Sequence, residues 1–266
     1  MTKNQCWGAF ILTLLWILPL SASLVIESSE QEGSDAPKTS RMILDSKGLR
    51  VENGDEILLF RPDKDLLWIL QPKTKTYHQL SETELTQMAD SLKQMQSQLD
   101  QLPPEQRAQL EILLNHQLPN SSTLPRTTPP QVTYEKLASG VKLGSWTCDH
   151  YAEKENGTKV GEVWTVPFTS LPGMTEFTGM MKRVGRFFSK MPGPGMDNPF
   201  FSFDDVAANS AAAPGYPVKD QRLDPQGAVI STWELKRLSE EKIDPSLFDL
   251  PTGYELKPFM EPEPQS

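Results

Sequence analysis

Cysteine is scarce in this sequence. Only Cys6, close to the N-terminus, and Cys148 occur among the 266 residues. Because Cys6 precedes an apolar N-terminal run that we expect to be removed, Cys148 would remain alone, which excludes an intramolecular disulfide. A hydrophobic core must therefore hold the fold, and a chain of this length can bury roughly 70–75% of its unfolded surface, enough for one full domain.

The residue patterns typical of catalysis are also missing. The sequence has no glycine-rich phosphate loop, no nucleophile elbow and no zinc-type spacing. Cys148 and His150 are two residues apart on one predicted strand, about 7 Å from each other, whereas a catalytic Cys–His pair needs about 3 Å. His78 and His116 fall in other elements. We therefore predict no catalytic residue, no metal and no cofactor, and an unrecognised hydrolase is the least favoured function.

Positive charge is lacking as well. The chain has 26 Lys and Arg against 35 Asp and Glu, a formal net charge of −9. This balance argues against nucleic acid, and against an anionic membrane surface, as a partner of the whole molecule.

Long apolar runs are limited to one, Trp7–Leu20, which is shorter than the roughly 20 residues that span a bilayer. Lys3 precedes the run and small residues follow it, as in a secretory signal peptide. We expect cleavage near Ser23, a periplasmic or secreted protein and no stable membrane insertion; an uncleaved anchor is the alternative.

The composition beyond this run predicts one domain with two interruptions. We expect a single domain over residues 41–258. The remaining predicted segments are a signal peptide (1–23), a disordered acidic lead-in (24–40), a linker (118–130), a low-complexity insert (192–226) and a tail (259–266). Three phenylalanines in the insert can bind a protein partner or fill a cavity as a plug; they are Phe200, Phe201 and Phe203.

Turn-forming residues recur every eight to twelve positions between residues 42 and 80, which is typical of an antiparallel meander. The predicted strands are 42–45, 49–52, 56–61, 66–70 and 76–80. Ile57 and Leu59 alternate with Leu58 and Phe60, so this sheet is apolar on both faces. Such a sheet must be covered on both faces, and one face can line a cavity.

A second β block is predicted over residues 131–166, with a further strand at 227–238. Its hairpin turns at Asn156-Gly157, the strongest short hairpin pattern. A two-residue turn places Tyr151 opposite Glu162 and Asp149 opposite Trp164. It also sets Lys154 against Lys159, which is mildly unfavourable, so a longer loop is the alternative. Trp146, Cys148 and Val163 would then share one face, and Tyr151, Trp164 and Val166 the other.

Two helical regions are expected. Ser81 and Glu84 form a capping box before an apolar stripe that runs to Leu102, and a second helix follows over about 105–117. A helical hairpin covering the sheet is favoured over a coiled coil, because the stripe is short. The region 174–191 has a Met- and Phe-rich face beside basic residues. It can be a core helix, a core helix that also forms a ligand wall, or a membrane-surface helix.

Some of these segments resemble a known family. The segment from Arg61 to Lys73, followed by Tyr77, resembles the turn–strand–turn of the lipoprotein-carrier (LolA/LolB-like) superfamily. The strand 144–151 with Glu162-Val163-Trp164, and the closing segment 248–254, are similar to exported bacterial proteins grouped as the DUF4412 domain. The resemblance implies an open β half-barrel whose concave side is plugged by helices around an apolar cavity. Its best-known use is carriage of lipids or lipoproteins.

The sequence thus predicts an α+β, mostly antiparallel β protein that forms an open half-barrel with covering helices. We expect it to sequester an apolar ligand such as a lipid or a lipoprotein acyl chain. The alternative is a periplasmic scaffold without a small-molecule ligand. The expected ligand-binding side chains are Phe60, Trp68, Trp146, Trp164, Phe177, Met181 and Phe188.

Overall fold

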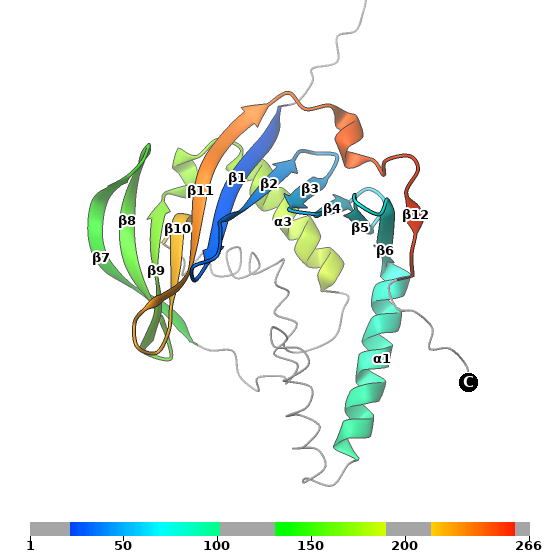
Figure 1. The fold of residues 1–266 in the computed structure, drawn as a ribbon, viewed down its shortest axis with the longest axis horizontal. Helices are drawn as coiled ribbons and strands as arrows, with labels where there is room; N and C mark the ends of the chain where they lie inside the picture. The colour runs from blue at the N-terminus through cyan, green and yellow to red at the C-terminus, as the bar shows by residue number, and fades with distance from the viewer. Residues whose placement is uncertain (1–21, 102–130, 190–213, 259–266) are drawn as a thin grey trace, which may run out of the picture.

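A computed structural model describes residues 22–101, 131–189 and 214–258 (Figure 1). The predicted signal peptide up to residue 21, the second predicted helix, the 118–130 linker, the tail and the three phenylalanines of the insert lie outside these ranges. Among the described residues, no helix combines the length and the apolar character needed to cross a bilayer.

Twelve strands form one sheet in the order β12-β6-β5-β4-β3-β2-β1-β11-β10-β9-β8-β7. All neighbours are antiparallel except β12 and β6, which are parallel. The sheet is open, with β12 and β7 at its edges. The strands are β1 (Ser23–Glu32), β2 (Lys38–Leu44), β3 (Leu49–Asn53), β4 (Glu56–Arg61), β5 (Leu66–Gln71), β6 (Thr76–Ser81), β7 (Val132–Leu143), β8 (Trp146–Glu155), β9 (Thr158–Val166), β10 (Tyr216–Leu223), β11 (Val229–Glu241) and β12 (Glu255–Leu256).

Two α-helices and two 3₁₀ turns complete the described fold: α1 (Glu82–Asp100), η1 (Phe168–Ser170), α3 (Met174–Phe188) and η3 (Pro245–Phe248). Figure 1 shows the sheet as an arch with α3 in its concave side. α1 extends away from the end of β6, so the prediction that this helix covers the sheet is wrong. The predicted capping box is present, since the Ser81 amide donates to Glu84 Oε2 at 2.6 Å. Leu85 of α1 is buried.

Both faces of the β2–β6 meander are covered, as its apolar pattern predicts. Leu58 and Phe60 belong to the core that contains the buried side chains of α3. The alternate residue Leu59 packs with Trp68 and Leu70 on the opposite face. There the second layer is the C-terminal segment 243–254, which we call the C-terminal strap. That face is closed by the chain itself and does not line a cavity.

The strap packs on two neighbouring parts of this face. Phe248 is 1% exposed and contacts Val25 and Ile43. Leu250 and Tyr254 pack against the cluster around Trp68. Each Å² of apolar surface that the strap buries contributes about 25 cal/mol to the free energy of folding. The strap is therefore an integral layer of the fold.

The prediction of a disordered lead-in at 24–40 is wrong. Residues 23–32 form β1, which lies in the middle of the sheet between β2 and β11. Leu24 and Ile26 point to the α3 side of the core, and Val25 packs under the strap. The polar second half of the strand hid this pattern. Its charge is matched across strands, since Glu27 lies 3.7 Å from Arg41.

The prediction that the whole 192–226 insert lacks a packed element is also wrong. Residues 216–223 form β10, which pairs with β9 and β11. Tyr216 is 2% exposed and makes edge-on contacts with Phe168 and Phe177. The polar residues between Val218 and Leu223 obscure the strand in the sequence.

The predicted turn between β8 and β9 is correct, but the predicted register is not. Asn156 and Gly157 both have positive φ, and Glu155 pairs with Thr158. An irregularity between Glu153 and Lys154 then shifts the pairing by one residue. His150 therefore lies opposite Trp164, and Tyr151 opposite Val163. Because a one-residue slip exchanges faces, the predicted grouping of Val163 with Cys148 is wrong; Trp164 and Val166 belong to the same core as Cys148.

Gly48 provides a test of how closely the sheet and the strap are packed. A Cβ on Gly48 would lie 2.6 Å from the Phe60 carbonyl oxygen and 3.3 Å from the Phe248 ring. Gly48→Ala should lower the free energy of unfolding by about 1–3 kcal/mol, measured by urea denaturation. Gly179→Ala is the matched control, because a Cβ there meets nothing within 4 Å and alanine favours the helix. Equal stability of the two variants would contradict this packing.

Candidate functional site

Six of the seven predicted ligand-binding side chains lie in or against the core on the α3 side. They are Phe60, Trp146, Trp164, Phe177, Met181 and Phe188. The structure does not place Trp68 with them, because Trp68 lies under the C-terminal strap and donates its indole N–H to Gln79 at 2.9 Å. Phe177 and Met181 are each 3% exposed and pack in the interior.

A hollow of about 400 Å³ lies beside this core, where the C-terminal half of α3 approaches two turns of the sheet. One is the β2–β3 turn (residues 45–48) and the other the β4–β5 turn (residues 62–65). The hollow is lined by Ser46, Phe60, Pro62, Asp63, Asp65, Arg183, Arg186 and Phe187. Only Phe60 of the predicted ligand-binding residues is among them.

Aromatic rings form one wall of the hollow. The Phe60 and Phe187 ring centroids are 5.3 Å apart, with the planes tilted by 59°. Phe188 contacts Phe187 edge-on at 5.1 Å. Aromatic pairs favour such tilted geometries. The wall is held from behind by the core, since Phe60 and Phe187 are each 2% exposed.

Charged side chains form the rim. Arg183 donates to the Ser46 carbonyl oxygen at 3.5 Å, and its exposed neighbour Arg186 also lines the hollow. Within the described ranges, neither arginine forms an ion pair with a carboxylate. The two arginines share the lining of the hollow with the carboxylates of Asp63 and Asp65.

The acidic side of the rim is partly neutralised. Arg61 Nε and Nη2 donate to the two carboxylate oxygens of Asp63, each at 2.9 Å. This bidentate contact lowers the pKa of Asp63 and raises that of Arg61. Asp63 therefore stays ionised with its charge compensated, and it opposes an anionic ligand less than a free carboxylate would.

A second cluster of polar side chains surrounds Trp164. The His150 ring stacks on Trp164 at 4.1 Å with the planes 7° apart, and the Lys219 ammonium lies 5.1 Å from the Trp164 ring centroid. His150 Nε2 and Glu162 Oε2 are 2.8 Å apart. Burial alone would raise the pKa of Glu162, but hydrogen bonds from Lys159 and His150 outweigh it and lower the pKa. The site is a packed and satisfied cluster on neighbouring strands.

Cys148 is a buried free thiol. Its side chain is 1% exposed within the core, and burial raises the pKa of the thiol. Among the described residues, no three His, Cys, Asp or Glu side chains gather closely enough to hold a metal ion.

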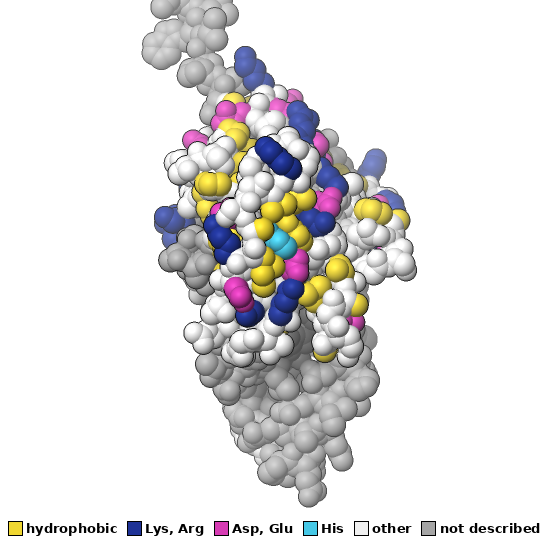
Figure 2. Space-filling model, turned by 90° about the vertical axis from the view of Figure 1, so that its left-hand side faces the viewer, with side chains coloured by type: hydrophobic (Ala, Val, Ile, Leu, Met, Phe, Trp, Pro, Cys, Tyr) yellow, Lys and Arg dark blue, Asp and Glu magenta, His cyan; other side chains and the backbone are white. Residues whose placement is uncertain are grey.

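The β7–β9 end of the sheet carries a different surface. Figure 2 shows hydrophobic side chains gathered on this face and bordered by Lys, Arg, Asp and Glu. Leu137 of the edge strand β7 is 47% exposed. This face is remote from the residues that line the hollow, which belong to α3 and to the β2–β5 part of the sheet.

The raised pKa and burial of Cys148 predict an inert thiol, because the thiolate is the reactive form. With Cys6 replaced by serine, the native protein at pH 8 should react with a disulfide reagent more than about tenfold more slowly than the same protein unfolded in denaturant. Absorbance of the released thiol group measures both rates. Rapid reaction of the native protein would show that this part of the core opens.

No family model and no curated protein matches the chain. One similar structure is that of an uncharacterised conserved protein from Thermus thermophilus, with 9% identity, 90% of this chain and 91% of that chain covered, and a TM-score of 0.42. Another is PNGF-II, with 10% identity, 90% of this chain covered and a TM-score of 0.34; the matched region is 31% of that chain. Both TM-scores are below 0.5, so neither likeness carries an argument about fold or function.

Proposed function

We propose that this chain is an exported binding protein that holds an apolar ligand, such as a lipid or a lipoprotein acyl chain, in the hollow beside α3. Its architecture would be an open half-barrel with α3 as the internal helix. The observation that carries the proposal is the hollow itself. It joins an aromatic wall, Phe60 and Phe187, to two arginines without a carboxylate partner in the described chain.

The size and chemistry of the hollow suit such a ligand. Small-molecule pockets typically enclose about 300–1,000 Å³ and combine an apolar lining with a few placed polar groups. An acyl chain against Phe60 and Phe187 would gain about 0.8 kcal/mol per buried methylene. Arg183 and Arg186 would meet its polar or anionic end.

The neighbouring side of α3 supports adaptation to ligands of different shape. Met180 and Met181 pack in the core just before Arg183 along the helix. Methionine side chains are flexible and polarisable, so they repack readily around irregular apolar groups. A small opening of the α3 contact would enlarge the hollow toward these residues.

The direct test is mass spectrometry of natively purified protein after solvent extraction. We expect an apolar compound in a near-stoichiometric amount. A comparison variant alters the hollow itself, with Phe60 and Phe187 both replaced by serine. If this variant folds, it should lose the compound. Protein that is empty after gentle purification, and that takes up no added fatty acid or phospholipid, would contradict the proposal.

The arginines provide a second test. Arg183→Gln with Arg186→Gln should weaken binding of an anionic fluorescent fatty acid by about fivefold or more, since an exposed charge-assisted contact contributes about 1 kcal/mol. Lys182→Gln is the control, because Lys182 is exposed on α3 and does not line the hollow. Equal losses in both variants would point to a general charge effect. Unchanged affinity in the double variant would exclude the hollow as the site.

A scaffold that binds a protein and holds no ligand is the second candidate. The hydrophobic face at the β7–β9 end favours it (Figure 2), because contiguous exposed apolar patches commonly mark interaction surfaces. If the natively purified protein contains no ligand and is stably folded without one, the scaffold is the better candidate.

A further inference from the structure

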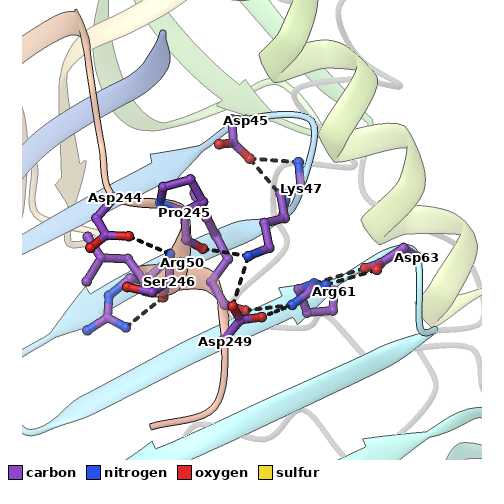
Figure 3. A network of polar contacts seen from close by, with 12 residues as sticks. Asp45, Lys47, Arg50, Arg61, Asp63, Asp244, Pro245, Ser246 and Asp249 are labelled. Carbon is purple, nitrogen blue, oxygen red and sulfur yellow. Dashed lines mark hydrogen bonds and ion pairs between the residues drawn. The ribbon is translucent and has the colours of Figure 1, made fainter. Parts of the chain in front are cut away.

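The C-terminal strap lies across the sheet from the hollow. Phe248 of the strap packs with Val25 and Ile43, which alternate along their strands with the Leu24 and Leu44 of the α3-side core. The strap therefore cannot touch a ligand in the hollow. Its polar contacts nevertheless reach both sheet turns that line the hollow (Figure 3).

One carboxylate of the strap connects these two turns. Lys47, in the β2–β3 turn, donates to Asp249 Oδ2 at 2.9 Å and to the Pro245 carbonyl oxygen at 2.7 Å. Arg61, directly before the β4–β5 turn, pairs with Asp249 Oδ1 and donates to the Phe248 carbonyl oxygen at 3.3 Å. Figure 3 shows Lys47, from the β2–β3 turn, and Arg61, at the end of β4, converging on Asp249.

Each connection continues into the lining of the hollow. Lys47 follows Ser46, a lining residue whose carbonyl oxygen accepts from Arg183. The Lys47 amide also donates to Asp45 Oδ1 at 2.7 Å, which fixes the turn from within. Any displacement of Lys47 therefore moves the wall that Arg183 contacts.

The Arg61 connection works in the same way. Its guanidinium binds Asp249 with one nitrogen and holds lining residue Asp63 with the other two. The Arg61 side chain is 7% exposed. A buried guanidinium that loses a carboxylate partner retains the cost of its desolvation. Loss of Asp249 would therefore let Arg61 shift, and Asp63, which it holds through two hydrogen bonds, would shift with it.

We propose that Asp249 is a positioning residue that sets the separation of the β2–β3 and β4–β5 turns and thereby the shape of the hollow on the other side of the sheet. This inference rests on the proposed function only for its effect on ligand affinity. The connection of the two turns through Asp249 stands on the contacts alone.

The contact is formed at neutral pH. Hydrogen bonding and charge from Lys47, followed by those from Arg61, lower the pKa of Asp249. A carboxylate whose pKa is lower in the folded protein stabilises it above the unfolded value, about 3.9, and loses that effect as the pH falls through the folded value. The contact therefore persists from about pH 4 through neutral pH.

The test compares Asp249→Ala and Asp249→Asn with Asp249→Glu and Asp244→Asn. Asp244 lies in the same strap and accepts from the Ser246 amide at 2.9 Å. Within the described part of the chain it forms no hydrogen bond or ion pair with Lys47 or Arg61, and Lys47 acts on it only through its charge. Thermal denaturation first shows which variants fold. Hydrogen exchange then reports on the turn amides of Asp45 and Lys64, which donate to Gly48 and Arg61 carbonyl oxygens at 3.1 Å.

We expect faster exchange in both turns for Asp249→Ala and Asp249→Asn, partial rescue by Asp249→Glu, and no change in the turns for Asp244→Asn. Affinity for the fluorescent fatty acid should fall about threefold or more in the first two variants, because displacement of the two turns changes the shape of the hollow. Unchanged exchange in the turns, or altered exchange with unchanged affinity, would overturn the inference. A native protein that binds no probe while its turns still loosen would refute the proposed function and leave the role of Asp249 in positioning intact.

Discussion

The fold depends on one constraint, which is that the β2–β6 meander is apolar on both faces and must be covered twice. Leu58 and Phe60 require one layer and Leu59 another, because strands that bury both faces cannot leave either in water. The chain supplies α3 to the concave side and the C-terminal strap to the other. Both layers come from sequence far downstream of the meander, so the sheet can be completed only after the chain has returned to it.

Much of this architecture can be predicted from local pattern. The strands of the meander, the capping box at Ser81 and the Asn156-Gly157 turn follow from turn chemistry and alternation. The fate of the second face could not be predicted in the same way. The chain or a ligand can cover an apolar face, and the sequence pattern of that face is the same in both cases. In this structure the chain covers it, because Phe248 packs on it.

The errors share a physical cause, which is that pairing partners distant in sequence override local composition. The polar end of β1 is compensated by Arg41, and Tyr216 anchors an otherwise polar β10 between two neighbours. A single irregularity after Glu153 exchanges the faces of the β8–β9 hairpin. At the hollow, Phe60 was predicted from its alternation, whereas Asp63 and Arg183 meet only because two turns and a helix converge there. The spacing of these residues along the chain does not predict that they meet.

We infer that the strap contacts and the hollow are coupled through the strands between them. Asp249 holds Lys47 and Arg61 from the strap side, while Phe60 and Phe187 meet on the α3 side of the same strands. The most direct measurement is a crystal structure with a fatty acid brominated near its tail, located by anomalous scattering. We predict a bromine peak beside Phe60 and Phe187, with the carboxylate toward Arg183. Bromine on the β7–β9 face or under the strap, with the hollow unoccupied, would contradict the account.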